Sequence, residues 1–93
     1  MAQNYDRAVV WWRKAAEQGG VTSQANLGIM YANGQGVAQD YKLAYVWSSV
    51  AAANGDSDAV KTRDLTASML TPTALSEAQT LAGQYFEKYR SQQ

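Results

Sequence analysis

The chain contains two nearly identical segments that are separated by 36 residues. Residues 2–19 read AQNYDRAVVWWRKAAEQG and residues 38–55 read AQDYKLAYVWSSVAAANG, so that nine of the 18 paired positions are identical. A fixed period of about 20–50 residues is typical of repeat proteins, in which each copy buries its apolar face against the next. The repeat therefore constrains the fold more strongly than any other feature of this sequence.

Each of the two copies is predicted to form one helix. Apolar residues in both copies follow the three- and four-residue spacing of one helical face. Asn4 and Asp40 stand at equivalent places before the helices and are good N-cap residues. Gly19 and Gly55 follow the helices, where a residue in the left-handed region closes a helix. The helices predicted from the two copies cover about residues 5–18 and 41–54.

Three further helices are predicted outside the two copies. One covers about residues 21–33 and ends before a glycine-rich loop. Another begins near Asp56 and runs to about Leu70, and the acidic residues at its start suit the positive end of the helix dipole. Thr71 is expected to cap the last helix, with Pro72 at its first position.

Gly28 lies inside one of these helices, where glycine costs up to about 1 kcal/mol relative to alanine. Close approach of a neighbouring helix is a physical reason for that cost. We expect a bulky Tyr or Trp of the neighbour to fill the space.

Several segments resemble the Sel1-like repeat family. The segments that carry the resemblance are KAAEQG (14–19), LGIMY (27–31), NGQGVAQDY (33–41) and AYVW (44–47). The 36-residue period and the G-x-G-V-x-x-D loop favour this family over the tetratricopeptide repeat, whose period is 34 residues. The resemblance implies an all-α fold, an α/α solenoid of antiparallel helix pairs stacked into a right-handed superhelix. It also implies a role as an adaptor or scaffold for other proteins.

We expect one domain of about five helices over residues 1–93. Its predicted parts are the second helix of an incomplete repeat (1–19), a full repeat (20–55) and C-terminal capping helices (56–93). Residues 56–72 share no identity with the segment 36 residues before them. Such divergence is expected of a terminal repeat, because it has no next neighbour to pack against. A fragment of a longer array is the alternative.

Composition and charge exclude several classes of function. Eight basic and eight acidic residues give a formal net charge of zero, so we expect no nucleic acid and no anionic membrane as partner. No apolar run approaches the roughly 18–20 residues of a membrane span, and the first residues lack the pattern of a signal peptide. If Met1 is the native start, the chain is expected to stay in the cytoplasm.

We expect no catalytic, cofactor or metal site. The sequence contains no Cys and no His, which removes thiol catalysis and the commonest general base and metal ligand. The resemblance implies one alternative, because some cysteine-rich relatives bind and hydrolyse β-lactams, but this chain lacks both cysteine and a Ser-x-x-Lys motif. Asp56 and Asp58 are interpreted as residues that cap a helix and favour its dipole, and not as a catalytic carboxylate pair.

The expected partner is a protein or peptide that binds on the concave side of the array. The first helix of each pair lines this side in a stacked helical array. Side-chain amides and a Met suit an extended peptide, through hydrogen bonds and adaptable apolar contacts. The alternative is an ordinary helix surface with one incidental Met. The residues predicted to form the concave surface are Asn26, Ile29, Met30, Asn33, Thr62 and Thr66.

The first helix is expected to associate with a second copy of the chain. Trp11 and Trp47 are equivalent, and we expect both to pack in the core, as large side chains at helical spacing usually do. No helix precedes the first one, however, so part of its apolar surface would stay exposed and hold a homodimer. The alternatives are that the last helix folds back over this end or that basic residues keep it solvated. The predicted self-association residues are Tyr5, Val9, Trp11 and Trp12.

Overall fold

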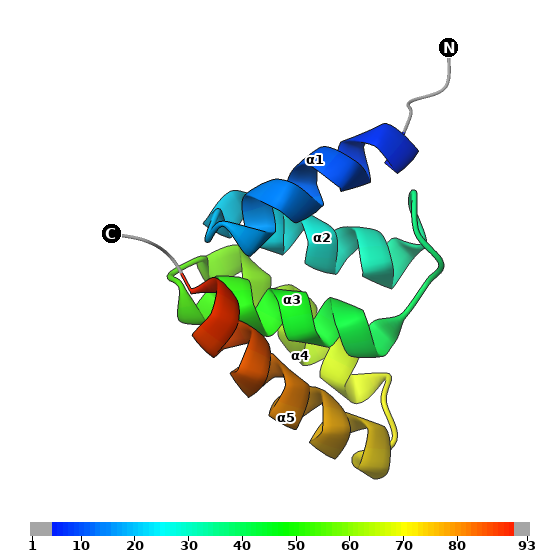
Figure 1. Cartoon of the computed structure of the whole chain (residues 1–93). Helices are drawn as coiled ribbons and strands as arrows, with labels where there is room; N and C mark the ends of the chain where they lie inside the picture. The colour runs from blue at the N-terminus through cyan, green and yellow to red at the C-terminus, as the bar shows by residue number, and fades with distance from the viewer. Residues whose placement is uncertain (1–4, 91–93) are drawn as a thin grey trace.

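The structure is a computed structural model that describes residues 5–90 of the chain. Its helices are α1 (Tyr5–Glu17), α2 (Val21–Asn33), α3 (Tyr41–Ala53), α4 (Ser57–Ser68) and α5 (Pro72–Tyr89). Successive helices run in opposite directions, and α1, α2 and α3 follow one another across the molecule (Figure 1). No strand occurs between residues 5 and 90. The prediction of an all-α helical repeat solenoid is therefore confirmed.

The helices begin and end at residues that the sequence marks for this purpose. Asp40 accepts a hydrogen bond from the backbone N–H of Leu43 at 3.0 Å, which caps α3. Thr71 caps α5 in the same way, with Pro72 at the start of the helix. Gly34 follows α2 in the left-handed region, with φ of 69°, a conformation that favours glycine. The predicted cap Asn4 lies outside the described residues.

The third helix, α3, occupies the centre of the fold and is buried on two sides. On one side Ala44 and Trp47 join the larger apolar cluster, to which α2 contributes Leu27. On another side Val46 packs against Ala78 of α5 in a smaller cluster. In Figure 1 α2 and α5 accordingly lie on either side of α3, with α4 behind it. Most of the apolar burial that stabilises this fold is thus organised around α3.

Aromatic rings fix the end of α5 against α3. The Trp47 ring lies 5.3 Å from the Tyr85 ring in an edge-to-face arrangement and 5.5 Å from the Tyr89 ring in a stacked one, between ring centroids. Such pairs each contribute about 0.5–1.5 kcal/mol beyond the area they bury. The apolar stripe of α5 is therefore used to cover Trp47.

The equivalent side chain Trp11 is exposed, so the prediction that it packs in the core is wrong. Trp11 is 70% exposed, whereas Trp47, 36 residues later, is 3% exposed. The difference arises because α5 covers Trp47, while no described helix covers the corresponding face of α1. The Lys14 ammonium lies 5.8 Å from the centre of the Trp11 ring, so that the ring is partly shielded by a cation.

Gly28 lies where α2 and α3 approach each other closely, as the sequence predicts. A Cβ atom at this position would collide with Ser48 Oγ and lie 3.2 Å from the Ser48 nitrogen and 3.3 Å from the Ala44 oxygen. The expectation that a Tyr or Trp fills the space is wrong. Small residues of α3 face Gly28, and the two backbones come close because neither helix has a large side chain there.

Candidate functional site

Helices α2 and α4 present two matching rows of side chains. Within each row the residues are spaced by four, three and four positions, so that they share one face of their helix. Each residue of one row is separated by 36 positions from its counterpart in the other. The rows are Thr22, Asn26, Ile29 and Asn33 on α2, and Asp58, Thr62, Leu65 and Met69 on α4 and its C-cap. Helices α2 and α4 contact each other, so the repeat places two equivalent helix faces side by side.

A groove of about 160 Å³ lies between these two helices. Ala25, Ile29 and Ala59 give it apolar surface, while Asn26 and Thr62 supply polar groups. An amide and hydroxyl groups both donate and accept hydrogen bonds, so the groove can pair with the backbone of a bound segment. The remaining residues that line the groove are Thr22, Asp56 and Asp58.

One end of the groove is acidic. Asp56 Oδ1 accepts hydrogen bonds from the backbone N–H groups of Asp58 at 2.9 Å and Ala59 at 3.1 Å, which caps α4. The capping role expected of Asp56 is therefore confirmed. Among residues 5–90, neither Asp56 nor Asp58 forms an ion pair within 4.0 Å.

Large apolar side chains stay exposed along the same face. Ile29 is 43% exposed, and Leu65, its counterpart in the other row, is 64% exposed. Met69 is exposed as well, one turn beyond Leu65. A face that combines exposed apolar side chains with a polar groove is suited to binding a polypeptide segment.

Comparison with known proteins identifies the repeat. The Sel1 repeat matches residues 1–20 and 21–56, which together make up more than half of the chain. This chain belongs to the Sel1 repeat family. A search of curated proteins finds no match.

The Sel1 chain is also similar to a solved structure. That structure is of a protective antigen present in uropathogenic Escherichia coli strains, which displays an SLR fold. The two superpose with a TM-score of 0.88 at 40% sequence identity, over 91% of this chain and 18% of the other. This Sel1 chain therefore spans less than a fifth of the length of the antigen.

The face that the two rows form, called the α2–α4 face below, contains some of the predicted concave residues and not others. Asn26, Ile29 and Thr62 line the groove, and Asn33 is exposed further along α2. Sequence reasoning missed Leu65 and Met69, although the repeat itself holds the signal, since a shift of 36 carries Ile29 onto Leu65.

Met30 and Thr66 are buried, so their predicted place on the concave surface is wrong. The two positions are again 36 residues apart. Met30 is 3% exposed and belongs to the large apolar cluster, because it lies on the same side of α2 as Leu27. The Thr66 hydroxyl bonds to backbone carbonyl groups of its own helix, 2.8 Å from the Thr62 oxygen. Its hydrogen-bonding capacity is thus used inside the fold.

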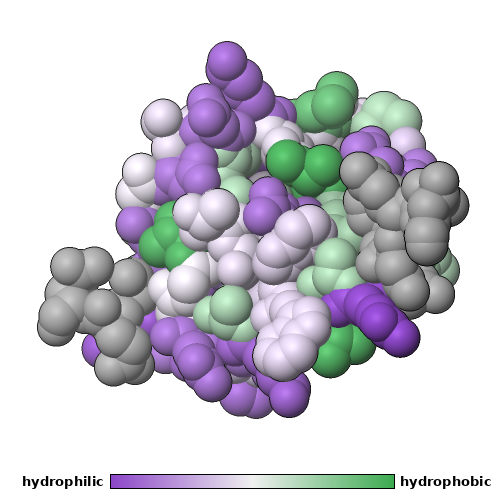
Figure 2. Space-filling view, turned by 90° about the horizontal axis from the view of Figure 1, so that it is seen from above, coloured by the Kyte–Doolittle hydropathy of each residue, from purple (hydrophilic) through white to green (hydrophobic). Residues whose placement is uncertain are grey.

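Some of the residues predicted for self-association are buried in the structure, and others are exposed. Val9 is buried in the large apolar cluster, so its assignment to an exposed surface is wrong. Trp12 is half-buried and packs against that cluster, which leaves Trp11 as the exposed member. The side chain of Tyr5 lies outside the described part of the structure. Figure 2, which views the molecule from above and so from the α1 side, shows apolar residues that reach the surface among hydrophilic ones.

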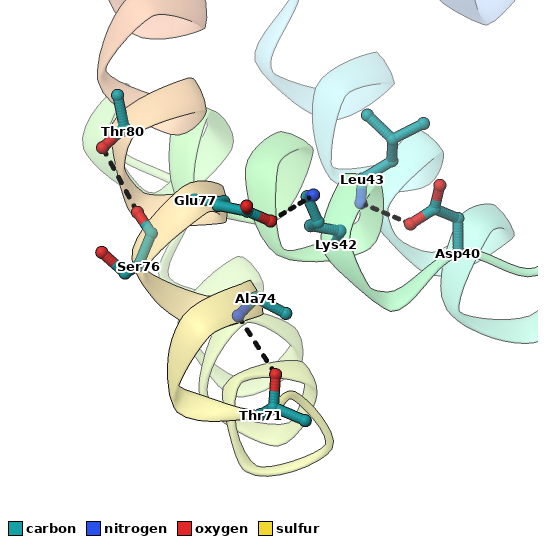
Figure 3. A network of polar contacts seen from close by, with 8 residues as sticks. All are labelled: Asp40, Lys42, Leu43, Thr71, Ala74, Ser76, Glu77 and Thr80. Carbon is teal, nitrogen blue, oxygen red and sulfur yellow. Dashed lines mark hydrogen bonds and ion pairs between the residues drawn. The ribbon is translucent and has the colours of Figure 1, made fainter.

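A second hollow of the Sel1 fold, about 380 Å³ in volume, lies between α3 and α5. At its edge the Lys42 ammonium pairs with Glu77 Oε1 at 2.8 Å (Figure 3). The hydrogen bond from Lys42 and the negative charge of Glu77 raise the pKa of Lys42 above its usual 10.5. The two charges satisfy each other and join α3 to α5, so this hollow is a weaker candidate than the α2–α4 groove.

Two further findings concern the Sel1 chain between residues 5 and 90. No helix in this range combines the length and the apolar character that crossing a membrane requires. The same range contains no group of three or more His, Cys, Asp or Glu side chains placed to hold a metal ion.

Proposed function

We propose that this Sel1 chain is a binding module that holds a peptide segment of another protein on the α2–α4 face. The observation that carries the proposal is the exposure of Ile29 and Leu65 at one repeat position of two adjacent helices. A single exposed apolar side chain is ordinary. Repetition on neighbouring helices beside a groove creates a continuous surface, and such surfaces are typical of protein interaction sites.

The groove supplies the chemistry that an extended segment needs. An unpaired backbone N–H or C=O of a bound peptide requires a partner, and Asn26 and Thr62 offer an amide and a hydroxyl for this purpose. Met69 is unbranched and adapts its shape, so it accommodates apolar side chains of different size. The α2–α4 face therefore combines affinity from apolar contact with hydrogen bonds to the peptide backbone.

A library of random ten-residue peptides, displayed on phage, tests this function. Peptides that are selected by the wild-type protein are then titrated against a variant with Ile29→Ser and Leu65→Ser, with fluorescence anisotropy as readout. We expect affinity to fall at least about tenfold, because two apolar contacts are removed. Val10→Ser is the matched control, since it removes an exposed apolar side chain from α1 instead. Equal affinity of the wild type and the double variant would contradict the proposal.

We infer that the module acts by binding and not by catalysis. The absence of Cys and His from the sequence supports this inference. A chromogenic β-lactam incubated with the protein is expected to hydrolyse at the rate measured in buffer alone. Turnover above that rate, lost together with the folded protein on heating, would favour the β-lactamase alternative.

Self-assembly through α1 is a second candidate function. The carrying observation is that Val10 and Trp11 are exposed, while the side chains 36 positions later, Val46 and Trp47, are buried beneath α5. An apolar side chain gains about 1.5–3 kcal/mol when it is buried, so these two, doubled across a two-fold axis, would favour a symmetric dimer. In such a dimer the second copy would bury the exposed apolar face of α1, as α5 buries the equivalent face of α3.

Light scattering coupled to size exclusion measures this association. We expect a dimer at micromolar concentration and a folded monomer for Trp11→Glu. Trp12 is not suited to this test, because it packs against the core and a charge there would destabilise the fold. A monomer mass for the wild type at high micromolar concentration would exclude self-assembly.

A further inference from the structure

We propose that the α2–α4 face selects a segment that carries a cationic side chain, which binds at the groove end formed by Asp56 and Asp58. The inference rests on the binding function proposed above and adds the charge of the partner and the position of that charge. It is carried by the groove, by the exposed apolar row and by the distribution of charge around them.

The charge of the groove comes from one helix alone. No residue of α2 is charged, so Asp56 and Asp58 set the potential on both sides. The start of α4 contributes about half a positive elementary charge, which two carboxylates exceed. The carboxylate of Asp58 is exposed and, among the described residues, accepts no hydrogen bond and forms no ion pair. A negative charge therefore remains for a partner to neutralise.

Within residues 5–90, no cation forms an ion pair with Asp56 or Asp58 at that end of the groove. Lys61 is the next cation along α4, and it forms no ion pair with either carboxylate in the described structure. The Arg63 guanidinium lies 3.1 Å from Asp64 and is paired there. Charge complementarity therefore favours a basic segment over an acidic one as the occupant of the groove.

The spacing of residues along each row predicts how far the cationic and the apolar side chain of the bound peptide are apart. Asp58 and Leu65 are seven residues apart on α4, which corresponds to about 10 Å along the helix. A peptide in the extended polyproline II conformation covers that distance in about three residues, at roughly 3.1 Å each, and its side chains three positions apart share one face. A cationic residue and an apolar residue three positions apart thus match Asp58 and the Ile29–Leu65 pair. Arginine suits two neighbouring carboxylates better than lysine, because its planar group donates along several directions.

Two short synthetic peptides test the charge and the spacing. One contains Arg-Ser-Ser-Leu and the other Glu-Ser-Ser-Leu, each flanked by Gly-Ser on both sides. Each is titrated into isotopically labelled protein, and the shifts of backbone amide signals are followed by NMR. We expect the arginine peptide to bind about tenfold tighter than the glutamate peptide and to shift the amides of Asp58 and Thr62. We also expect its affinity to fall as salt is raised.

Matched variants of α4 locate the charge. Asp58→Asn is expected to weaken binding of the arginine peptide about threefold to tenfold. Asp64→Asn removes an exposed carboxylate from the same helix but outside the groove, and is expected to leave affinity unchanged. Asp58→Asn keeps the Asp56 cap but removes a charge that favours the start of α4, so its unfolding midpoint should lie at most a few degrees below that of the wild type. Asp64→Asn should match the wild type.

The outcomes separate this inference from the proposed function. Equal binding of both peptides, or unchanged affinity in Asp58→Asn, combined with loss of binding in Ile29→Ser, would overturn the charge selection and keep the binding face. Binding that none of these variants alters, or no binding of either peptide, would overturn the inference. In that case the selected library peptides decide whether the binding face itself stands.

Discussion

The side-chain amide of Gln24 donates a hydrogen bond to the backbone carbonyl of Tyr89, 65 residues further along the chain, at 2.8 Å. Gln24 is fully buried, and its amide also donates to the Ala16 carbonyl at 3.0 Å. Its oxygen accepts from the Asn54 amide at 2.9 Å. One side chain of α2 thus joins the ends of α1, α3 and α5, and each of its polar atoms has a partner.

Replacing Gln24 with leucine is expected to destabilise the protein by at least about 2 kcal/mol. The change leaves the partly buried Tyr89 carbonyl and the Asn54 amide without this partner and removes one of the two hydrogen bonds of the Ala16 carbonyl. A buried polar group that loses its partner costs about 1–3 kcal/mol. Urea denaturation followed by circular dichroism measures the loss. Gln79→Leu is the matched control, because Gln79 is exposed on α5 and surface changes usually alter stability by less than about 0.5 kcal/mol. Equal midpoints for the two variants would contradict this role of Gln24.

Alanine at position 28 is expected to destabilise the fold by about 1–3 kcal/mol through overpacking. Its Cβ would collide with Ser48 Oγ and press on the backbone of α3 at Ala44. Leucine at this position should cost more. Gly83→Ala is the control, since no atom beyond its chain neighbours and its own helix backbone lies within 4 Å of a Cβ there. It should stabilise the helix by up to about 1 kcal/mol. The thermal unfolding midpoint is measured for both variants. It should fall for Gly28→Ala, where overpacking dominates, and rise for Gly83→Ala, where only helix propensity changes.

Ser48→Ala is expected to recover part of the stability that Gly28→Ala removes. The Ser48 hydroxyl is buried and has no hydrogen-bond partner in the described structure, so its removal alone should cost little. Because the hydroxyl is the atom that collides with the added methyl, the two substitutions should be non-additive. A double-mutant cycle in urea measures the coupling. Strict additivity would show that the collision is relieved elsewhere, at the backbone of α3.

The fold could be predicted from the sequence because its signals are local. The helical spacing of apolar residues, the caps at Asp40 and Thr71 and the glycines after the helices each act within a few residues. The structure contains each predicted helix. Burial depends instead on which helix lies above a residue. Trp11 and Trp47 stand at equivalent positions of the repeat, yet only Trp47 lies beneath α5.

The candidate site could be predicted only in part for the same reason. The sequence-based prediction assumed that α2 is covered on one side and buries a single stripe of residues. Under that assumption Met30 lies on the surface. Helix α2 contacts α1, α3 and α4, so its buried stripe is wider and includes Met30 and Gln24. Leu65 was not predicted because residues 56–72 share no identity with residues 20–36, although its position in the repeat is that of Ile29.

The two equivalent tryptophans are expected to respond differently to truncation. Trp47→Ala removes a buried ring that packs against Tyr85 and Tyr89, and it should cost about 3–5 kcal/mol. Trp11→Ala removes an exposed ring and should change the stability of the monomer by less than about 0.5 kcal/mol. Chemical denaturation at low protein concentration, where self-association is negligible, measures both. Similar losses would show that Trp11 is covered in solution.

Met30 and Ile29 are adjacent in sequence, and alanine at each is expected to affect a different property. Met30→Ala creates a cavity beneath α2 and should destabilise the fold by about 2–5 kcal/mol. Ile29→Ala shortens an exposed side chain, so it should leave the unfolding midpoint within a few degrees while it weakens binding of any peptide selected on the α2–α4 face. Thermal unfolding and peptide titration on the same two variants separate the effects. Loss of stability in Ile29→Ala, with binding unchanged, would assign Ile29 to the core and remove the central contact of the proposed site.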